Sequence, residues 1–278
     1  IIGLVVFTAI PFFTSLYLAF TKYNVLSDPK WVGLANFKEM FFEDELFWTS
    51  FKVTFKFALI QVPVKLTVAL LVAMVLARAT RVTSFYRAAF YIPSLMGGSV
   101  AIALLWKQLF SPKGVINQIL GFFVLPDDTA WLGNPKTALG TLIALGVWQF
   151  GSSMLIFLAA IKNIPSSYYE AAIVDGAGPV RRFFSITLPL LTPIIFFNLI
   201  NQVIGAFQAF NSSYLITKGK PLNTTLYYGV HLYNKAFNQF EMGYGSAMAW
   251  FMLLIIAFFT ALIFRSSSAW VYYESEGR

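Results

Sequence analysis

Polar and small side chains inside two otherwise apolar segments are the residues of this chain best suited to contact a small molecule. They are Trp148, Gln149, Ser152 and Ser153 within residues 138–161, and Asn198, Asn201, Gln202, Gly205 and Gln208 within residues 191–211. Amide and hydroxyl groups beside an aromatic ring are typical of sugar sites, because they hydrogen-bond hydroxyls while the ring covers an apolar face. The alternative is that these side chains bond neighbouring helices to one another.

Lys65 lies deep within the apolar stretch 54–77, with Gln61 one helical turn away on the same face. A charged side chain at such a position should face a cavity or a protein partner rather than lipid. None of the six apolar segments described below holds an acid at mid-depth to pair with it. Lys65 therefore predicts either pairing across a subunit interface or contact with an anionic substrate, such as a uronate-type oligosaccharide.

The stretch 163–179 predicts a short helix followed by a tight turn. Ser167 and Glu170 have the spacing of a capping box, which satisfies free amides at a helix start. Gly176 suits the helix end, and Gly178-Pro179 suits the start of a second helix. Such a helix, with small residues on one flank, can enter a groove on a partner protein. The alternative is a helix lying on lipid, although the stretch lacks the Lys/Arg-rich face of an interfacial anchor.

Other chemistry is excluded by the residue inventory. The chain has no Cys and one His, which argues against a metal site and excludes disulfides. It contains no G-x-x-x-x-G-K-[ST] phosphate loop, so ATP cannot be hydrolysed here by that route. We therefore expect no enzyme activity, no metal and no cofactor in this chain.

The composition indicates a membrane protein. Of 278 residues, 58% are hydrophobic and only 12% are charged, and mean hydropathy is +0.69. A soluble fold of this size cannot bury that much apolar surface, so a soluble enzyme or a nucleic-acid-binding module is excluded despite the net charge of +8. Six segments are apolar enough to cross a bilayer, about 1–20, 54–77, 88–110, 138–161, 191–211 and 246–264.

The positions of arginine indicate the orientation of these spans. All seven lie in segments that would be cytoplasmic if both termini are cytoplasmic, at 78, 81, 87, 181, 182, 265 and 278. The chain also opens in an apolar segment without Met, so we expect a further stretch to precede Ile1.

The 163–189 loop resembles the EAA signature of ABC importer permeases. Glu170-Ala-Ala, three residues, Gly176, nine residues, Ile186, one residue and Leu188-Pro189 match that signature at every fixed position. The run EAAIVDGAGPVRRFFSITLPLLTP resembles the carbohydrate-uptake branch, of the maltose and glycerol-phosphate type. Three other stretches, WVGLANF, YRAAFYIPSLMGGSVAIALLWKQLF and FNSSYLITKGKP, extend the likeness over most of the chain, although Lys220 stands where the family commonly has Gly.

The resemblance implies an all-α fold with six transmembrane helices forming one domain over 1–278, the type I importer permease fold. It also implies the partners, which are a second permease subunit, two cytosolic ATPase subunits that hold ATP and Mg, a periplasmic or extracellular solute-binding protein, and a sugar. The chain would lie in the bacterial cytoplasmic membrane, in contact with its lipids. ATPase coupling would fall to residues of the EAA loop, namely Glu170, Ala171, Ala172, Asp175, Gly176 and Ala177.

Two other classes of function remain as alternatives. A self-contained, ion-coupled carrier needs intramembrane acids and internal repeats, and the spans show neither. A membrane-embedded enzyme needs a nucleophile or an acid–base pair, and no such cluster occurs.

Overall fold

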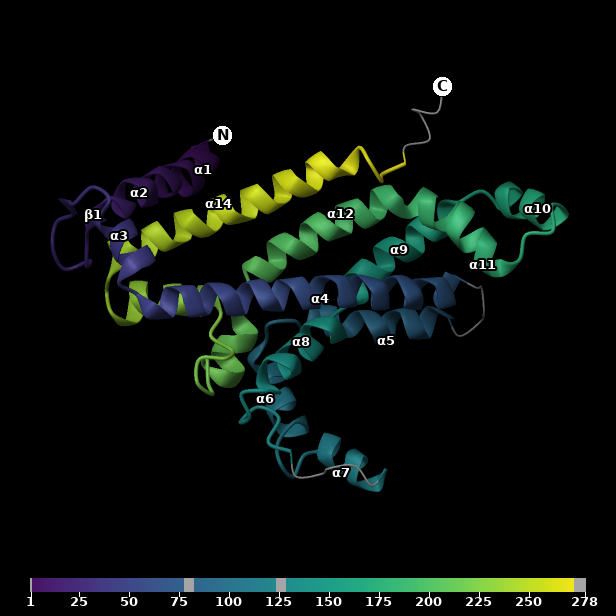
Figure 1. Ribbon diagram of the computed structural model, residues 1–278, viewed down its shortest axis with the longest axis horizontal. Helices are drawn as coiled ribbons and strands as arrows, with labels where there is room; N and C mark the ends of the chain where they lie inside the picture. Colours follow the sequence, from purple (N-terminus) through teal and green to yellow (C-terminus); the bar gives the residue numbers. More distant parts are fainter. Residues whose placement is uncertain (1, 78–82, 124–128, 273–278) are drawn as a thin grey trace. The chain divides into compact units, whose positions relative to one another are not determined.

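A computed structural model describes residues 2–77, 83–123 and 129–272 of the chain (Figure 1). These residues are helical apart from turns and one short antiparallel hairpin, in which Thr21 pairs with Trp31. The chain divides into two compact units, each built from three separate stretches. The first unit is Ile1–Phe57, Ala103–Thr141 and Phe207–Phe258, and the second is Ala58–Ile102, Leu142–Ala206 and Phe259–Arg278.

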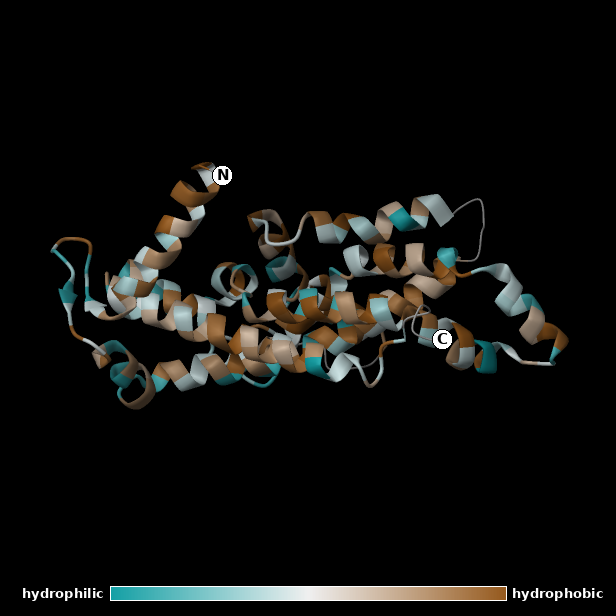
Figure 2. Ribbon diagram, turned by 90° about the horizontal axis from the view of Figure 1, so that it is seen from above, coloured by the Kyte–Doolittle hydropathy of each residue, from teal (hydrophilic) through white to brown (hydrophobic). Residues whose placement is uncertain are grey.

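Four described helical runs are long and apolar enough to cross a membrane, at Ile2–Ala19, Glu45–Ala77, Pro179–Phe207 and Met242–Ser267. Two bent helix pairs raise the number to six when each pair counts as one span, Thr83–Leu95 with Val100–Leu109 and Ala138–Trp148 with Gly151–Asn163. Hydrophobic residues cover most of the helical ribbon, including the N-terminal helix (Figure 2). The fold is therefore the all-α, multi-span architecture that the sequence predicts.

The first unit contains the N-terminal helix, the hairpin and the segments that join several spans. Its elements in chain order are α1 (Ile2–Leu4), the π-helical turn η1 (Val5–Ala9), α2 (Ile10–Ala19), β1 (Thr21–Lys22), β2 (Lys30–Trp31), α3 (Ala35–Phe42), the first part of α4 (Glu45–Ala77), most of α6 (Val100–Leu109), α7 (Val115–Phe122), the start of α8 (Ala138–Trp148), the π-turn η3 (Ser213–Thr217), α13 (Tyr228–Tyr233), the π-turn η4 (Asn234–Asn238) and most of α14 (Met242–Ser267).

An aromatic cluster at the start of α4 forms the core of this unit. Asp44 Oδ1 accepts hydrogen bonds from the backbone amides of Leu46 and Phe47, which caps the helix. The fully buried Phe47 ring then packs edge-on against Tyr228 and Phe251, with centroid separations of 5.8 and 5.4 Å. Edge-to-face packing of this kind stabilises a core beyond the area that it buries.

The second unit contains the remainder of α4 and α8, together with α5 (Thr83–Leu95), α9 (Gly151–Asn163), α10 (Ser166–Val174), α11 (Pro179–Arg182), the π-turn η2 (Phe183–Thr187) and α12 (Leu188–Phe207). Helices α5 and α9 pack closely because Gly151 has no side chain. A methyl group there would collide with the backbone of Phe90 and Tyr91.

Three predicted spans differ in extent or continuity from the helices that contain them. Helix α4 starts at Glu45 rather than Thr54, because the Asp44 cap begins a helix whose first turns are too polar to register as apolar. The predicted third span is broken at residues 96–99, where the two helices bend by 103° and Gly98 has φ +78°. The predicted fifth span, 191–211, runs as helix from Pro179 and ends at Phe207.

Candidate functional site

Two helix breaks in the second unit lie next to each other and share one hydroxyl group. The α8–α9 pair bends by 41° around Gln149 and Phe150. Ser94 Oγ, from the last turn of α5, donates to the Gln149 carbonyl oxygen at 3.1 Å and accepts from the Ser152 amide at 3.2 Å. Backbone freed inside a membrane must find partners within the protein or a water-filled cavity. Ser94 supplies that partner for the α8–α9 break.

Glycines bring two glutamine amides into the same region. A methyl on Gly97, in the α5–α6 break, would lie 2.9 Å from Gln149 Oε1. A methyl on Gly146 of α8 would lie 2.9 Å from Gln61 Nε2 on α4. The Gln61 side chain is buried, and its Oε1 has no hydrogen-bond partner among the described residues. A buried amide oxygen without a donor is costly, so Gln61 Oε1 needs a hydrogen-bond donor that the described residues do not supply.

The polar residues predicted on α12 form two kinds of hydrogen bond, one to a neighbouring helix and the other within α12. Gln202 Nε2 donates to Ser153 Oγ of α9 at 3.1 Å, which joins the two helices. Asn198 and Asn201 instead donate to carbonyl oxygens one turn back in their own helix, at 3.0 and 2.8 Å. Asn198 is buried, whereas Asn201 is exposed.

The remaining predicted pathway residues do not all lie together. Trp148, Ser152 and Gly205 are exposed in the second unit. Gln208 lies beyond the end of α12 and belongs to the first unit. Gln208 therefore does not share a face of α12 with Asn201, because the helix ends at Phe207.

Lys65 lies in the second unit, one turn after Gln61 on α4. Its side chain is half-buried, and no carboxylate lies within 4 Å of it in the part of the chain that the structure describes. Sequence analysis singled out Lys65, but it did not assign Gln61 and Ser94 to the site. Two features of the sequence could have indicated them. Gln61 lies one helical turn from Lys65, and Ser94 directly follows Pro93.

The segment that matches the EAA signature extends beyond the helices that it connects (Figure 1). Gly176 ends α10 with φ +74°, the left-handed conformation that glycine adopts without strain, and Pro179 opens α11. The phenol of Tyr169 lies 2.9 Å from Thr187 Oγ1, which fixes α10 against the start of the fifth span. The helix-turn-helix prediction is confirmed.

The predicted capping box does not form. Helix α10 begins at Ser166, its cap position is Pro165, and no side chain bonds the free amides there. The reason is that Pro165 starts the helix before Ser167, so Ser167 and Glu170 are both inside it. Ser167 and Glu170 are exposed.

A hollow of about 520 Å³ lies along the small flank of α10. Ala171, Ala172 and Asp175 line one side of it, and Pro189 and Tyr272 are among the residues of the other side. The other face of the segment is apolar and exposed, with Ile173 at 56%, Val174 at 88% and Val180 at 71% of their surfaces accessible. An exposed apolar surface of this kind marks a site of contact with a protein or a membrane.

A buried titratable cluster in the first unit escaped sequence analysis. His231 Nε2 lies 2.7 Å from Asp44 Oδ2, and Tyr244 donates to the same oxygen at 2.6 Å. His231 is buried. Glu241, just before α14, pairs with Lys235 at 3.0 Å. Because Asp44 and His231 are 187 positions apart, no local spacing could have shown the contact.

The pKa values of this pair move in the same direction. Burial raises the pKa of Asp44, but hydrogen bonds from Tyr244 and His231 outweigh it and hold the pKa below its ordinary value. Burial lowers the pKa of His231, although Asp44 opposes that shift. At neutral pH the pair therefore consists of a carboxylate and a neutral imidazole that donates through Nε2.

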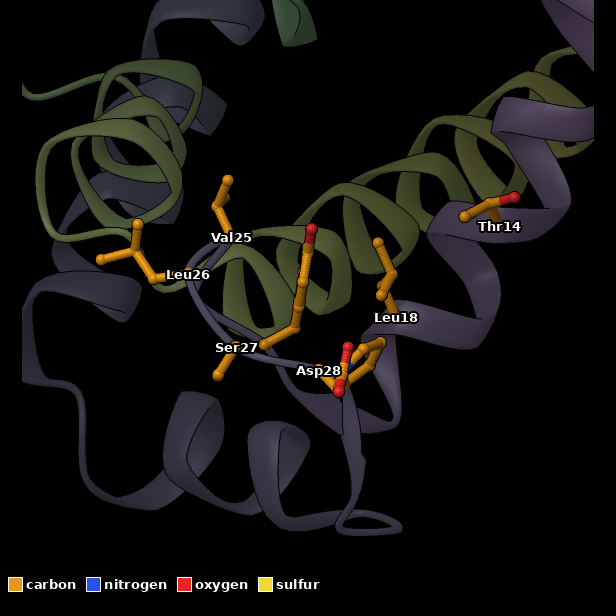
Figure 3. Close-up of a pocket in the computed structure, with 8 residues that line it drawn as sticks. Thr14, Leu18, Val25, Leu26, Ser27 and Asp28 are labelled. Atoms are coloured by element: carbon orange, nitrogen blue, oxygen red, sulfur yellow. The ribbon is translucent and has the colours of Figure 1, made fainter.

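Two further hollows lie in the first unit. One, of about 440 Å³, is lined by residues of α2 and of the β1–β2 loop; Figure 3 shows Thr14 and Leu18 on α2 and Val25, Leu26, Ser27 and Asp28 on the loop. The other, of about 430 Å³, is lined by Lys107 and Lys220 with Phe110, Ser111 and Thr217. No group of three or more metal-ligating side chains occurs in residues 2–77, 83–123 and 129–272.

Comparisons with known proteins identify this architecture. Residues 65–271 match the family model of the binding-protein-dependent transport system inner membrane component. The chain is 55% identical, over 99% of its length and 90% of the relative's, to the "Probable ABC transporter permease protein YesP" of Bacillus subtilis. It is 32% identical to the lactose transport system permease protein LacF of Rhizobium radiobacter, over 86% of this chain and 81% of that one.

Solved structures agree on the fold. A chain of a bacterial alginate ABC transporter, crystallised in complex with an alginate pentasaccharide-bound periplasmic protein, superposes with a TM-score of 0.82 over 96% of this chain and 90% of that chain, at 22% identity. The chain therefore belongs to the family of binding-protein-dependent transport system inner membrane components, and it is a multi-pass ABC transporter permease with the type I importer fold.

Proposed function

We propose that this chain forms one half of the translocation pathway of an ATP-driven importer for sugars or oligosaccharides. A second permease subunit supplies the other half, two cytosolic subunits hold and hydrolyse ATP with Mg, and a solute-binding protein delivers the sugar. The EAA segment, 163–189, transmits the motion of the ATPase subunits to the spans. Both termini and this segment then lie on the cytoplasmic side of the bacterial inner membrane.

The exposed apolar face of α10 and α11 is the observation that supports coupling most strongly. Ile173, Val174 and Val180 are exposed although they are apolar, which a soluble surface seldom tolerates in one place. The segment is held rigidly by Tyr169 and Thr187, so a push on it can reach the fifth span. Within it, the residues proposed to contact the ATPase are Glu170, Ala171, Ala172, Asp175, Gly176 and Ala177.

The polar groups at the two helix breaks support a sugar as the substrate. Gln61 Oε1 has no donor among the described residues, and Gln149 lies in the same unit, at the bend of the α8–α9 pair. Relatives are named for the transport of lactose, starch degradation products and arabinooligosaccharides. Half-buried Lys65, which has no described acidic partner, favours an acidic, uronate-type member of this class.

Cross-linking tests the coupling assignment directly. Because the chain has no Cys, a single Val174→Cys substitution gives one reactive thiol on the exposed face of α10. In membranes containing the whole transporter, we expect a maleimide that carries a photoreactive benzophenone, attached to Val174→Cys and then illuminated, to join this chain to the ATPase subunit. The matched control, Lys113→Cys, is equally a single exposed thiol, but in the proposed topology it lies on the side of the membrane opposite to α10. It should give no such product.

The same variant also tests the lipid alternative. A spin label on Val174→Cys should report slow motion and low accessibility to lipid-soluble oxygen in the assembled transporter. High oxygen accessibility without cross-linking would place the helix on lipid and would contradict the proposal.

A further inference from the structure

Two lysines from distant parts of the sequence line one hollow in the first unit. Lys107 lies in the last turn of α6, and Lys220 lies in the loop after η3. We call this space, lined by Lys107, Phe110, Ser111, Thr217 and Lys220 among others, the dilysine hollow. It measures about 430 Å³, and its lining contains no carboxylate. Neither lysine forms an ion pair within the described residues.

The wall that holds Lys107 and Phe110 is rigid. Asn117 is buried, and its Nδ2 donates to the carbonyl oxygens of Pro112 and Thr129, both at 3.0 Å. Its Oδ1 accepts from Trp131 Nε1 at 2.6 Å. The Phe110 ring packs against Trp131 edge-on, with the centroids 6.1 Å apart. These contacts fix the aromatic ring at the hollow before any ligand arrives.

The wall that holds Lys220 is equally constrained. Lys218 and Gly219 both have left-handed backbone conformations, with φ of 52° and 84°. The buried Thr225 Oγ1 lies 2.8 Å from both Thr217 Oγ1 and the Lys220 carbonyl oxygen. The tight turn therefore presents the Lys220 side chain from a backbone that is already ordered.

We propose that the dilysine hollow is an entry subsite for the acidic sugar residue of a uronate-bearing oligosaccharide. The two ammonium groups would hold the carboxylate, Ser111 and Thr217 would bond ring hydroxyls, and Phe110 would cover the apolar face of the sugar. The volume falls within the roughly 300–1,000 Å³ of small-molecule sites. Two cations that have no acid among the described residues of the lining select an anion over a neutral sugar.

The position of the hollow in the chain fits entry rather than exit. Its walls come from the end of the third candidate span, which holds Lys107, from the segment between the third and fourth spans, and from the segment between the fifth and sixth. In a six-span protein both segments lie on the side opposite to the segment between the fourth and fifth spans, which contains α10. This inference rests on the proposed function, since an outer location follows only if α10 is cytosolic.

Thiol protection tests the subsite at its own location. In the whole transporter, reconstituted in phosphatidylcholine nanodiscs without ATP or binding protein, Ser111→Cys places one thiol of this chain in the hollow. We expect trigalacturonate to slow maleimide labelling of this thiol, as measured by mass spectrometry of the chain, while maltotriose at the same concentration does not. Labelling of Lys136→Cys, outside the hollow, should be unaffected by either sugar.

Charge variants on the Ser111→Cys background identify the lysines responsible. K107Q/K220Q should raise the half-protecting concentration of trigalacturonate about tenfold, as expected for two exposed charge pairs. K113Q/K136Q removes the same charge from exposed lysines of the 107–137 segment that do not line the hollow. It should leave protection unchanged.

Several results would overturn the subsite. They are an absence of protection, equal protection by maltotriose, equal protection by inorganic phosphate, or equal losses in the two double variants. Slow labelling in phosphatidylglycerol nanodiscs without sugar would assign the hollow to lipid headgroups. Protection by the binding protein alone, with none by trigalacturonate, would make it a protein-docking surface. Because this assay uses no ATP, its outcome is independent of whether α10 couples to an ATPase.

Discussion

The imidazole of His231 lies 2.7 Å from Asp44 Oδ2, which joins α13 to the start of α4 across 187 positions of sequence. Asp44 Oδ1 caps α4, and Oδ2 accepts from both His231 and Tyr244. One buried carboxylate thus ties together three helices of the first unit.

Replacing this carboxylate should destabilise the first unit. In Asp44→Asn, an amide nitrogen would face the donors of His231 and Tyr244, so we expect a loss on the order of 3 kcal/mol. The thermal midpoint of the purified chain in detergent, followed by tryptophan fluorescence, measures this. Asp28→Asn, in the exposed β1–β2 loop, is the matched control. An equal midpoint for the two variants would contradict the structural role of Asp44.

Acidification should weaken the same cluster. The pKa of His231 in the folded state is below its ordinary 6.5, and that of Asp44 is below its ordinary 3.8. Both side chains bind protons more readily in the unfolded state. Their contributions to the free energy of unfolding are therefore fully present above the ordinary pKa values, and they are lost as the pH falls through the lower pKa values of the folded state. The thermal midpoint should fall as the pH is lowered from 6.5, and further below 3.8. His231→Gln should flatten the upper part of this dependence. A wild-type midpoint that rises between pH 6.5 and 5 would refute the assignment.

Close packing at the α8–α9 break should not tolerate a side chain. Gly151→Ala would place a methyl against the backbone of Phe90 and Tyr91, so we expect lower yield and lost uptake. Gly140→Ala is the matched control, because a methyl on Gly140 meets nothing within 4 Å. Size-exclusion profiles and uptake rates of the two variants provide the measurement. Equal behaviour would show that α5 and α9 are not in contact at this glycine.

Substrate preference should respond to Lys65. Lys65→Ala should reduce uptake of an acidic oligosaccharide about tenfold relative to a neutral one, without loss of assembly, because it removes a cation one helical turn from Gln61. Lys56→Ala, on the same helix but exposed and on the opposite face, should change neither. If Lys65→Ala prevents the subunits from associating, its role is structural.

The sequence predicted the spans and the EAA segment because both depend on local patterns, namely apolar runs and a fixed spacing around Glu170 and Gly176. It could not predict the break at 96–99, because Gly97-Gly98 is equally compatible with close packing in a straight helix. The structure shows both features, since Gly97 approaches Gln149 and Gly98 has a left-handed backbone.

The contacts between distant segments escaped prediction for a different reason. Gln202 could be assigned to a helix face, but its partner Ser153 depends on how α9 and α12 pack. The presence of Lys107 and Lys220 in the lining of one hollow similarly depends on how the end of α6 and the loop after η3 fold. Hydropathy and residue spacing describe one segment at a time, whereas each of these arrangements depends on the packing of two segments.

ATPase coupling through α10 is tested most directly by ATP-driven uptake in proteoliposomes that contain the whole transporter and its binding protein. Glu170→Lys should reduce uptake and substrate-stimulated ATP hydrolysis at least tenfold, because it reverses an exposed charge on the proposed docking surface, while the assembled complex keeps its size. Glu43→Lys, an equal charge reversal at an exposed site in the first unit, should leave both rates unchanged. Uptake and ATP hydrolysis at wild-type rates in Glu170→Lys would contradict the account.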